Sequence, residues 1–360
     1  MLGRMLRREL LTLLTWLTAA PSRVGAAEAE TARGAMRFPA DFGAHPASRT
    51  EWWYLTGSLN ASARLWGFQV TFFRSATGIV DAQGSRFAPT ELVFAHAALS
   101  DLEGRRLRHD QRIARSGFGI ARAQTDDTDV LLRDWRLLRS GGAYQATVAS
   151  DSANFALDLR AAPTQPLLLQ GEAGVSRKGP RPEQISHYYS EPQLAVQGRL
   201  TLEGAALEVQ GRAWLDHEWS DAYLDPQAVG WDWIGMNLDD GSALTAFQMR
   251  RRDGSALYAG GSFRRPGEAA RNFAPNEVAF TPGRRWSSGS SKASYPVEWQ
   301  VATPAGVFGV RALLDDQELD SRVSTGAIYW EGVSDLLDAR GERVGRGYLE
   351  MTGYAAALKL

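Results

Sequence analysis

The sequence predicts an all-β protein built from two related antiparallel β-barrel units, with little helix after residue 26. Three observations support this class. Apolar side chains occupy alternate positions at Trp66, Phe68, Val70 and Phe72, a period of two that is typical of strands with one buried face. Turn signals such as Asp239-Asp240-Gly241 recur between such stretches, which is the pattern of many short strands in sandwiches or barrels. Few long stretches of helical periodicity follow residue 26.

A weak internal repeat suggests that the two units are copies of one design. Trp52-Trp53-Tyr54-Leu55 leads through a loop to Phe72-Phe73-Arg74, and Trp231-Asp232-Trp233-Ile234 leads similarly to Gln248-Met249-Arg250. The order is the same in both halves, although the spacing differs. Chance similarity between two β-hairpins is the alternative explanation.

A basic and proline-rich segment, residues 177–182, reads as a solvated linker or loop. We therefore expect the domain boundary at residue 180. The predicted units are an N-terminal barrel at 27–180 and a C-terminal barrel at 181–360.

The first 26 residues read as a signal peptide. Arg4, Arg7 and Arg8 precede an apolar run over 10–20, and Val24-Gly25-Ala26 offers a small-residue cleavage site. The run is too short to cross about 30 Å of hydrocarbon as a helix, and a buried amphipathic helix is the alternative. Later stretches are too short or too polar to span a membrane, so we expect an exported, periplasmic or secreted protein with no integral membrane span in the mature chain.

Composition argues against several classes of function. The 40 basic and 41 acidic side chains nearly balance, which gives no electrostatic case for binding nucleic acid. The chain has no cysteine, so disulfides, thiolate-bound zinc, iron–sulfur clusters and thiol nucleophiles are excluded. Neighbouring histidines are at least 13 residues apart, so no helical zinc pair is present and we expect no metal. We find no phosphate-binding loop, dinucleotide glycine pattern or nucleophile elbow, so no cofactor is expected.

Aromatic and ionisable side chains concentrate in a few segments, namely 51–54, 187–190, 214–219 and 231–233. Neighbours in a strand point to opposite faces, so His217 is expected to share a face with Trp219, and Asp216 with Glu218. Trp231 and Trp233 likewise share one face while Asp232 takes the other. An apolar box with such groups could hold an apolar ligand or donate a proton to it. The alternative is structural: tryptophans as core plugs, and Asp232 as a buried hydrogen-bond acceptor.

Several motifs carry a family resemblance that spans about residues 37–354. These are 51–57 (Glu-Trp-Trp-Tyr-Leu-Thr-Gly), 68–74, 94–101, 187–190, 214–220 (Trp-Leu-Asp-His-Glu-Trp-Ser), 231–233 and 345–354. In this order they resemble the carotenoid 1,2-hydratase (hydroxyneurosporene synthase) and AttH-like lipocalin family. The chain is most similar to its exported branch, often labelled predicted secreted hydrolase. The resemblance implies two tandem lipocalin-like antiparallel β-barrels packed together.

The resemblance also implies a chemistry. The hydratases add water to a terminal isoprenoid alkene: an acid protonates one alkene carbon, and water captures the tertiary cation formed at the other. Carried over by motif, the candidate catalytic residues are His217 and Trp219, with Asp232 as the best available acid. The candidate ligand-binding residues are Trp52, Trp53, Tyr54, Tyr189, Trp231 and Trp233. One feature departs from the family pattern: the strand after Trp-Asp-Trp carries Phe247, Gln248 and Met249, where the hydratases have an acid.

Three functions are consistent with these observations. The first is an exported protein that binds an apolar isoprenoid or lipid-like molecule and catalyses hydration or a related lyase or hydrolase step. The second is a non-catalytic carrier of such a ligand. The third is a structural two-barrel module acting through a protein partner, which predicts no cavity of roughly 300 Å³ or more. For the first function, His217→Ala is expected to abolish turnover without loss of folding.

Overall fold

The computed structural model describes residues 36–61, 63–79, 85 and 87–358. The predicted signal peptide, residues 1–26, lies outside the described residues. The all-β prediction is confirmed: the described chain forms two large antiparallel sheets, sheet A and sheet B, and one two-stranded sheet. The 3-10 helices found in it are η1 (Ala40–Phe42) and η2 (Pro275–Glu277). No helix within the described ranges is long and apolar enough to cross a membrane.

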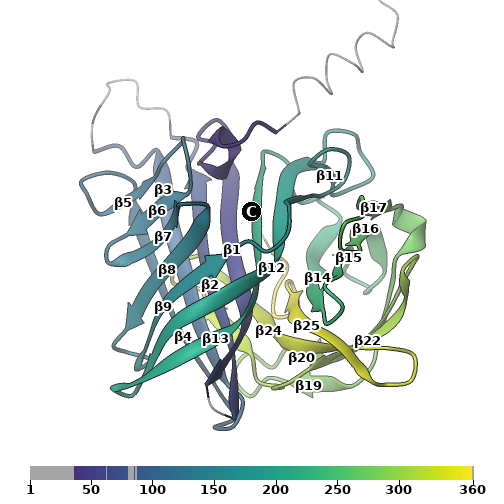
Figure 1. Ribbon diagram of the computed structural model, residues 1–360. Helices are drawn as coiled ribbons and strands as arrows, with labels where there is room; N and C mark the ends of the chain where they lie inside the picture. Colours follow the sequence, from purple (N-terminus) through teal and green to yellow (C-terminus); the bar gives the residue numbers. More distant parts are fainter. Residues whose placement is uncertain (1–35, 62, 80–84, 86, 359–360) are drawn as a thin grey trace, which may run out of the picture. The chain divides into compact units, whose positions relative to one another are not determined.

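Sheet A contains 13 strands in the order β4-β3-β2-β1-β13-β12-β9-β8-β7-β6-β5, with β10 and β11 also paired to β12. The two ends of this order approach each other, so sheet A is a nearly closed barrel. Its strands, purple to teal in Figure 1, are β1 (Thr50–Ala61), β2 (Arg64–Ala76), β3 (Glu91–Asp101), β4 (Arg106–Arg115), β5 (Ala121–Ala123), β6 (Asp129–Leu132), β7 (Trp135–Ser140), β8 (Ala143–Ser150), β9 (Phe155–Ala162), β10 (Leu168–Leu169), β11 (Val175–Arg177), β12 (Ile185–Leu202) and β13 (Ala205–Ser220).

Sheet B contains ten strands in the order β17-β16-β15-β14-β25-β24-β22-β21-β18, with β23 paired to β24. They are β14 (Ala228–Leu238), β15 (Ala243–Arg251), β16 (Ala256–Arg264), β17 (Arg271–Phe273), β18 (Ala279–Pro282), β21 (Glu298–Thr303), β22 (Gly306–Ala312), β23 (Glu318–Ser321), β24 (Ala327–Leu337) and β25 (Arg343–Met351). The two-stranded sheet pairs β19 (Arg285–Ser287) with β20 (Ser294–Pro296).

The described residues form three large apolar cores and one small cluster around Ala98, Leu319 and Tyr329. The first fills the inside of sheet A, and it contains the four alternating residues predicted to be buried, Trp66, Phe68, Val70 and Phe72. The second belongs to sheet B. The third lies where the two sheets meet, and Trp214 of sheet A contributes to it. Burying a large apolar side chain stabilises a fold by roughly 1.5–3 kcal/mol. The third core therefore stabilises the packing of sheet A against sheet B without disulfides.

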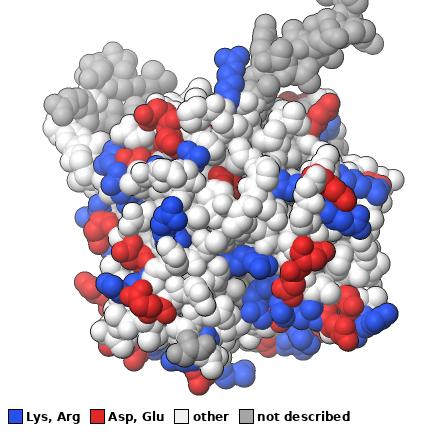
Figure 2. Space-filling model, in the orientation of Figure 1, with Lys and Arg blue, Asp and Glu red and all other residues white. Residues whose placement is uncertain are grey.

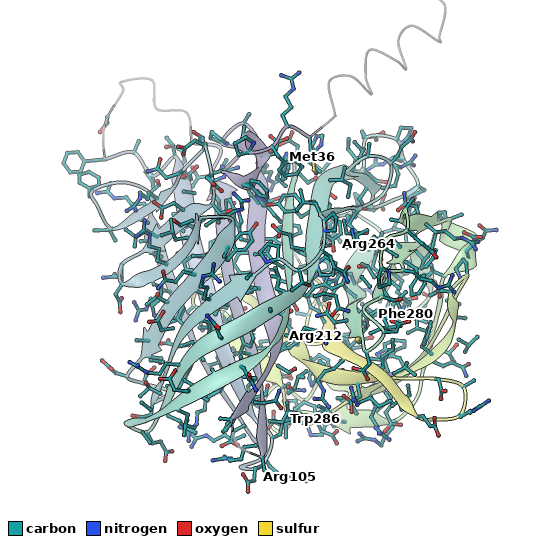
Figure 3. All side chains as sticks on the ribbon, in the orientation of Figure 1. Met36, Arg105, Arg212, Arg264, Phe280 and Trp286 are labelled. Atoms are coloured by element: carbon teal, nitrogen blue, oxygen red, sulfur yellow. The ribbon has the colours of Figure 1, made fainter. Side chains whose placement is uncertain are left out.

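Polar side chains add further ties between the sheets. Arg212 of β13 donates to the backbone oxygen of Leu238 at the end of β14, at 3.3 Å. Arg264 of β16 donates to the backbone oxygen of Leu167, at 2.8 Å (Figure 3). On the face drawn in Figure 2, basic and acidic side chains are interspersed.

The weak repeat corresponds to a real equivalence. Each sheet opens with a hairpin, β1–β2 or β14–β15, in which Trp53 lies opposite Phe72 and Asp232 lies opposite Gln248. In each sheet the first strand also pairs with the last, β1 with β13 and β14 with β25. In both halves, therefore, the last strand of the large sheet lies beside its first strand.

The predicted boundary at residue 180 needs correction. The chain passes from sheet A to sheet B between Ser220 and Ala228. The hairpin β12–β13, assigned to the second unit, is needed to complete sheet A, because β12 pairs with β9 and β13 pairs with β1. The segment 177–182 is a loop inside the first unit, and its Lys178 side chain is only 2% exposed rather than solvated.

Candidate functional site

A cavity of about 320 Å³ lies between sheets A and B, and its walls combine aromatic rings with carboxyl groups. The residues with functional side chains that line it include Trp52, Tyr54, Phe73, Phe94, His96, Tyr188, Asp216, Glu218, Tyr223, Trp231, Trp233, Tyr329, Glu331 and Glu350. They come from β1, β2, β3, β12 and β13 of sheet A and from β14, β24 and β25 of sheet B, with Tyr223 from the connection between β13 and β14. The cavity therefore exists only where the two sheets meet.

The aromatic wall is built from rings packed edge to face. Tyr223 contacts Trp52 and Trp231 with centroid distances of 5.0 and 5.3 Å. Tyr54 contacts Trp233 at 5.4 Å. Such pairs prefer this geometry because the positive edge of one ring meets the negative face of the other. The wall is consequently rigid, and the exposed ring faces are suited to an apolar or cationic partner.

Glu331 of β24 is the most unusual side chain of the cavity. It is 3% exposed, and its Oε1 atom and the Tyr54 hydroxyl both lack a hydrogen bond of regular geometry. Burial raises the pKa of Glu331 well above its usual range, with a further increase from Glu350, while the nearby Tyr54 hydroxyl opposes the rise. Burial therefore favours the protonated form of Glu331, next to the Tyr54 hydroxyl in the cavity wall.

Glu350 of β25 is the second acid on the sheet B side. Its Oε2 accepts a hydrogen bond from the Trp231 indole at 2.9 Å. Burial raises the pKa of Glu350 to about 7, although the Trp231 hydrogen bond opposes the shift. Near neutral pH this group exists in both protonation states, which suits a general acid or base.

Asp216 of β13 faces the same cavity from sheet A. It accepts hydrogen bonds from the hydroxyls of Ser190 and Tyr188, at 2.6 and 2.8 Å, and from the Trp214 indole at 2.6 Å. Burial raises the pKa of Asp216 to about 7 despite these bonds. With three donors in place, Asp216 is firmly held and is a positioning group for the wall around it.

Glu218, two residues along the same strand, is balanced by a buried cation. Lys178 Nζ lies 2.9 Å from Glu218 Oε1, and the Ser186 hydroxyl also donates to that oxygen. Burial raises the pKa of Glu218, and Lys178 opposes the rise. The Lys178 ammonium also lies over the rings of Tyr188 and Phe247, each 4.5 Å from the centroid. This packing explains why a lysine from a basic loop is buried.

A family model described as AttH-like matches residues 29–354. The chain belongs to the AttH-like family. This confirms the resemblance found in the motifs. The crystal structure of an AttH-like protein from Nitrosomonas europaea is 49% identical, with a TM-score of 0.83 over 89% of this chain and 97% of that one. The structure of kievitone hydratase from Nectria haematococca is 15% identical, with a TM-score of 0.69 over 89% and 94%, and shows the same fold. No protein among the curated sequences matches this one.

The AttH-like fold divides the candidate residues from the sequence between two places. Trp52, Tyr54, Trp231 and Trp233 line the cavity. Trp53, Tyr189 and Trp219 instead belong to the core inside sheet A. The predicted alternation is right in each segment, since Asp216 and Glu218 face the cavity while His217 and Trp219 face the other way.

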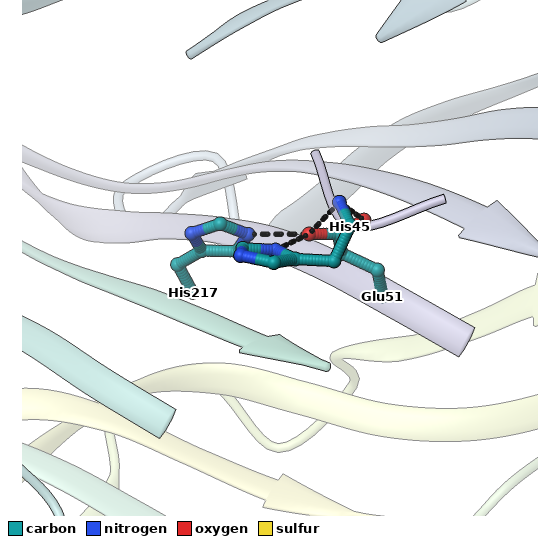
Figure 4. Close-up of side chains that lie close together, drawn as sticks. All are labelled: His45, Glu51 and His217. Carbon is teal, nitrogen blue, oxygen red and sulfur yellow. Dashed lines mark hydrogen bonds and ion pairs between the residues drawn. The ribbon is translucent and has the colours of Figure 1, made fainter. Parts of the chain in front are cut away.

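His217, a candidate catalytic residue, is fully buried inside sheet A. Figure 4 shows it beside Glu51 and His45. Its Nε2 lies 2.9 Å from Glu51 Oε1, its Nδ1 lies 3.1 Å from the Tyr189 hydroxyl, and its ring stacks on Trp53 at 4.6 Å. Burial lowers the pKa of His217, while Glu51 opposes the shift. Trp219 is stacked on His45 at 3.6 Å. Neither His217 nor Trp219 is among the side chains that line the cavity.

Asp232, the acid favoured by motif, is also turned away from the cavity. Its two oxygens accept hydrogen bonds from Gln248 at 2.8 Å, Arg250 at 2.9 Å and the Tyr354 hydroxyl at 2.9 Å. Asp232 is fully buried and both of its oxygens accept hydrogen bonds. It therefore has the structural role that was the alternative to catalysis. Strand alternation places it there, because Trp231 and Trp233 occupy the cavity face.

Glu331 and Glu350 were missed by motif reasoning. A usable signal was present: each carboxyl lies two residues after an aromatic side chain, Tyr329 or Tyr348, in a strand with alternating polarity. The departure noted at Phe247–Met249 is compatible with this arrangement. Phe247 belongs to the core between the sheets, so on the sheet B side the cavity acids Glu331 and Glu350 come from β24 and β25 instead.

Proposed function

We propose that this AttH-like protein binds an apolar, unsaturated small molecule in the cavity and catalyses addition of water to a carbon–carbon double bond, or the reverse elimination. The observation that carries the proposal is Glu331, a buried carboxyl group in an aromatic cavity, where burial and the neighbouring Glu350 raise its pKa and favour the protonated form. An acid kept neutral by its apolar surroundings is the group that proton transfer to an alkene requires.

The proposed reaction balances without a cofactor. Glu331 transfers its proton to one alkene carbon, and the positive charge develops on the other carbon. The faces of Trp52, Tyr223 and Trp231 are available to stabilise that charge. Glu350, with a pKa of about 7, accepts a proton from the attacking water. The carboxyl groups exchange roles in the elimination direction.

The fold shared with kievitone hydratase is consistent with this reaction class. At 15% identity the likeness extends to the fold and not to the substrate. The acid and the aromatic wall of this chain are therefore the basis of the proposal. A cavity of about 320 Å³ argues against the hypothesis of a purely structural module, because that hypothesis predicts no cavity of this size.

The proposal is tested first by identifying the ligand. Native mass spectrometry of the protein purified from its own host is expected to detect a co-purifying apolar molecule. That molecule is then incubated with the protein in heavy-oxygen water, and incorporation of the label into the product is measured. Wild type is expected to give labelled product, and Glu331→Gln is expected to give none while still retaining the ligand.

The carrier alternative makes a different prediction for the same experiment. A carrier retains the ligand in both proteins and produces no labelled product in either. Failure to find any apolar ligand, together with failure of the cavity to bind an isoprenoid alcohol such as farnesol, overturns both functions.

We also propose that the chain is exported, on the strength of the basic and apolar pattern in residues 1–26. Cell fractionation is expected to find a shortened chain outside the cytoplasm. Leu14→Arg, which interrupts the apolar run, is expected to keep an unprocessed chain inside. An unprocessed cytoplasmic wild-type chain contradicts export.

A further inference from the structure

Three potential metal ligands, two near the start of β1 and one from β13, converge at the end of sheet A. His45 precedes β1, Glu51 lies near its start, and His217 lies in β13. His45 Nδ1 is 2.7 Å and His217 Nε2 is 2.9 Å from Glu51 Oε1 (Figure 4). The three ligand atoms lie within 4.8 Å of one another. We infer that His45, Glu51 and His217 form a binding site for one zinc ion.

The spacing is close to that of a zinc site. Zinc binds imidazole nitrogen and carboxylate oxygen at about 2.0–2.2 Å in tetrahedral geometry, which places ligand atoms about 3.3 Å apart. The nitrogen-to-oxygen distances of 2.7 and 2.9 Å are about half an ångström shorter than this, and all three ligand atoms lie within 4.8 Å of one another, so side-chain adjustments bring them to the zinc spacing. Two histidines and one carboxylate are also a ligand set that zinc uses with a water in the fourth position.

Each histidine is oriented through its other ring nitrogen. His45 Nε2 lies 3.2 Å from Asp41 Oδ1, and His217 Nδ1 lies 3.1 Å from the Tyr189 hydroxyl. Metal-binding histidines usually donate this second N–H to a carboxylate or other oxygen, which fixes the tautomer with the lone pair toward the metal.

The charges around the cluster also favour a dication. Arg74 Nε donates to Glu51 Oε2 at 2.8 Å, whereas Oε1 faces both histidine rings and also accepts the His45 backbone N–H at 3.1 Å. The same guanidinium pairs with Glu91 at 3.1 Å. The carboxylates of Asp41, Glu51 and Glu91 with the single guanidinium leave two net negative charges, which one zinc ion neutralises.

An entry path exists on the His45 side. The side chains of His45 and Asp41 are 20% and 21% exposed, whereas those of Glu51 and His217 are fully buried. An ion can therefore reach the cluster from solvent through the loop that carries His45. Once bound, it would join this loop to β1 and β13 and stabilise the folded state.

Calorimetric titration of the chelator-treated full chain with zinc chloride, combined with elemental analysis, tests the inference. Wild type is expected to bind one zinc ion per chain and to unfold at a higher temperature when it is present. His45→Ala is expected to weaken binding at least about 100-fold, because a direct ligand contributes more than the 10–100-fold of an outer partner. His187→Ala is the matched control, since His187 stacks on Trp219 as His45 does but is not one of the three ligands.

A second variant keeps the test decisive if His45→Ala does not fold. Asp41→Asn retains the size of the side chain and is expected to weaken zinc binding about tenfold by loosening His45. No zinc binding by wild type, or equal affinity in wild type, His45→Ala and Asp41→Asn, overturns the inference. Equal loss in His187→Ala also overturns it, because the effect would then not depend on these ligands. None of these readouts depends on the proposed hydration activity.

Discussion

Glu331 of β24 and Glu350 of β25 are directly opposite each other in the antiparallel ladder, and both line the cavity. Side chains in this relationship have Cβ atoms about 4.5–5.5 Å apart. Two buried carboxyls so close cannot both ionise without strong repulsion, so the pKa of one must rise. Burial and this repulsion raise the pKa of Glu331 well above its usual range, and burial raises that of Glu350 to about 7.

The first prediction concerns Glu331 itself. Glu331→Gln keeps the shape of the protonated acid but has no proton to give, so turnover is expected to disappear while the melting temperature stays the same or rises. Labelled-water incorporation and thermal unfolding measure the two effects. Glu342→Gln, an exposed change in the β24–β25 turn, is the control and is expected to alter neither. Full turnover by Glu331→Gln removes the acid assignment.

The second prediction concerns the pH dependence of stability. Burial raises the pKa of Glu350 from 4.5 to about 7, so the folded state binds this proton more tightly than the unfolded chain does. The stabilisation is present below pH 4.5 and is lost as the pH rises to 7. The unfolding free energy of wild type relative to Glu350→Gln is therefore expected to decrease by about 3 kcal/mol as the pH rises from 4.5 to 7.

Comparison with this variant is necessary because another group acts in the opposite direction. Burial lowers the pKa of His96 to about 3, so its contribution to stability is lost as the pH falls below 6.5. Denaturant titrations at several pH values separate the two, since His96 is common to both proteins. A difference that is constant between pH 4.5 and 7 contradicts the shifted pKa of Glu350.

The third prediction concerns the buried pair of Lys178 and Glu218. Lys178→Met leaves the Glu218 carboxylate without its cation, which is expected to reduce stability by about 3–5 kcal/mol. The double variant Lys178→Met/Glu218→Gln is expected to recover part of this loss, because no unpaired charge remains. Denaturant unfolding measures both. The exposed pair Arg199 and Glu208 is the control, and its removal is expected to change stability by less than about 1 kcal/mol.

The fourth prediction separates a structural from a catalytic role for Asp232. Asp232→Asn removes the charge that balances Arg250 and is expected to cost about 3 kcal/mol of stability without affecting ligand retention or turnover. Asp335→Asn breaks a more exposed pair with Arg346 and is expected to cost less. If Asp232→Asn abolishes turnover in a fully stable protein, Asp232 regains the role that motif reasoning assigned to it.

Several features of the site were predictable from local sequence. The period of two in 214–219 and 231–233 correctly assigns each side chain to one of two strand faces. The order of motifs correctly indicates the family. What alternation does not reveal is the surroundings of each face. The same rule puts His217 with Trp219 and Asp216 with Glu218, but it does not say which pair meets a cavity and which meets a barrel interior.

The sequence alone predicted an all-β chain in two related halves, because strand periodicity and turn chemistry are local properties. The tertiary structure decided where the halves divide, because the hairpin β12–β13 belongs to sheet A through its pairing with the distant strands β1 and β9. It also decided which acids line the cavity. Glu331 and Glu350 meet Tyr54 and Asp216 only because two sheets pack together, and His45, Glu51 and His217 converge only when β13 pairs with β1. Contacts of this kind depend on distant chain segments, and no local pattern encodes them.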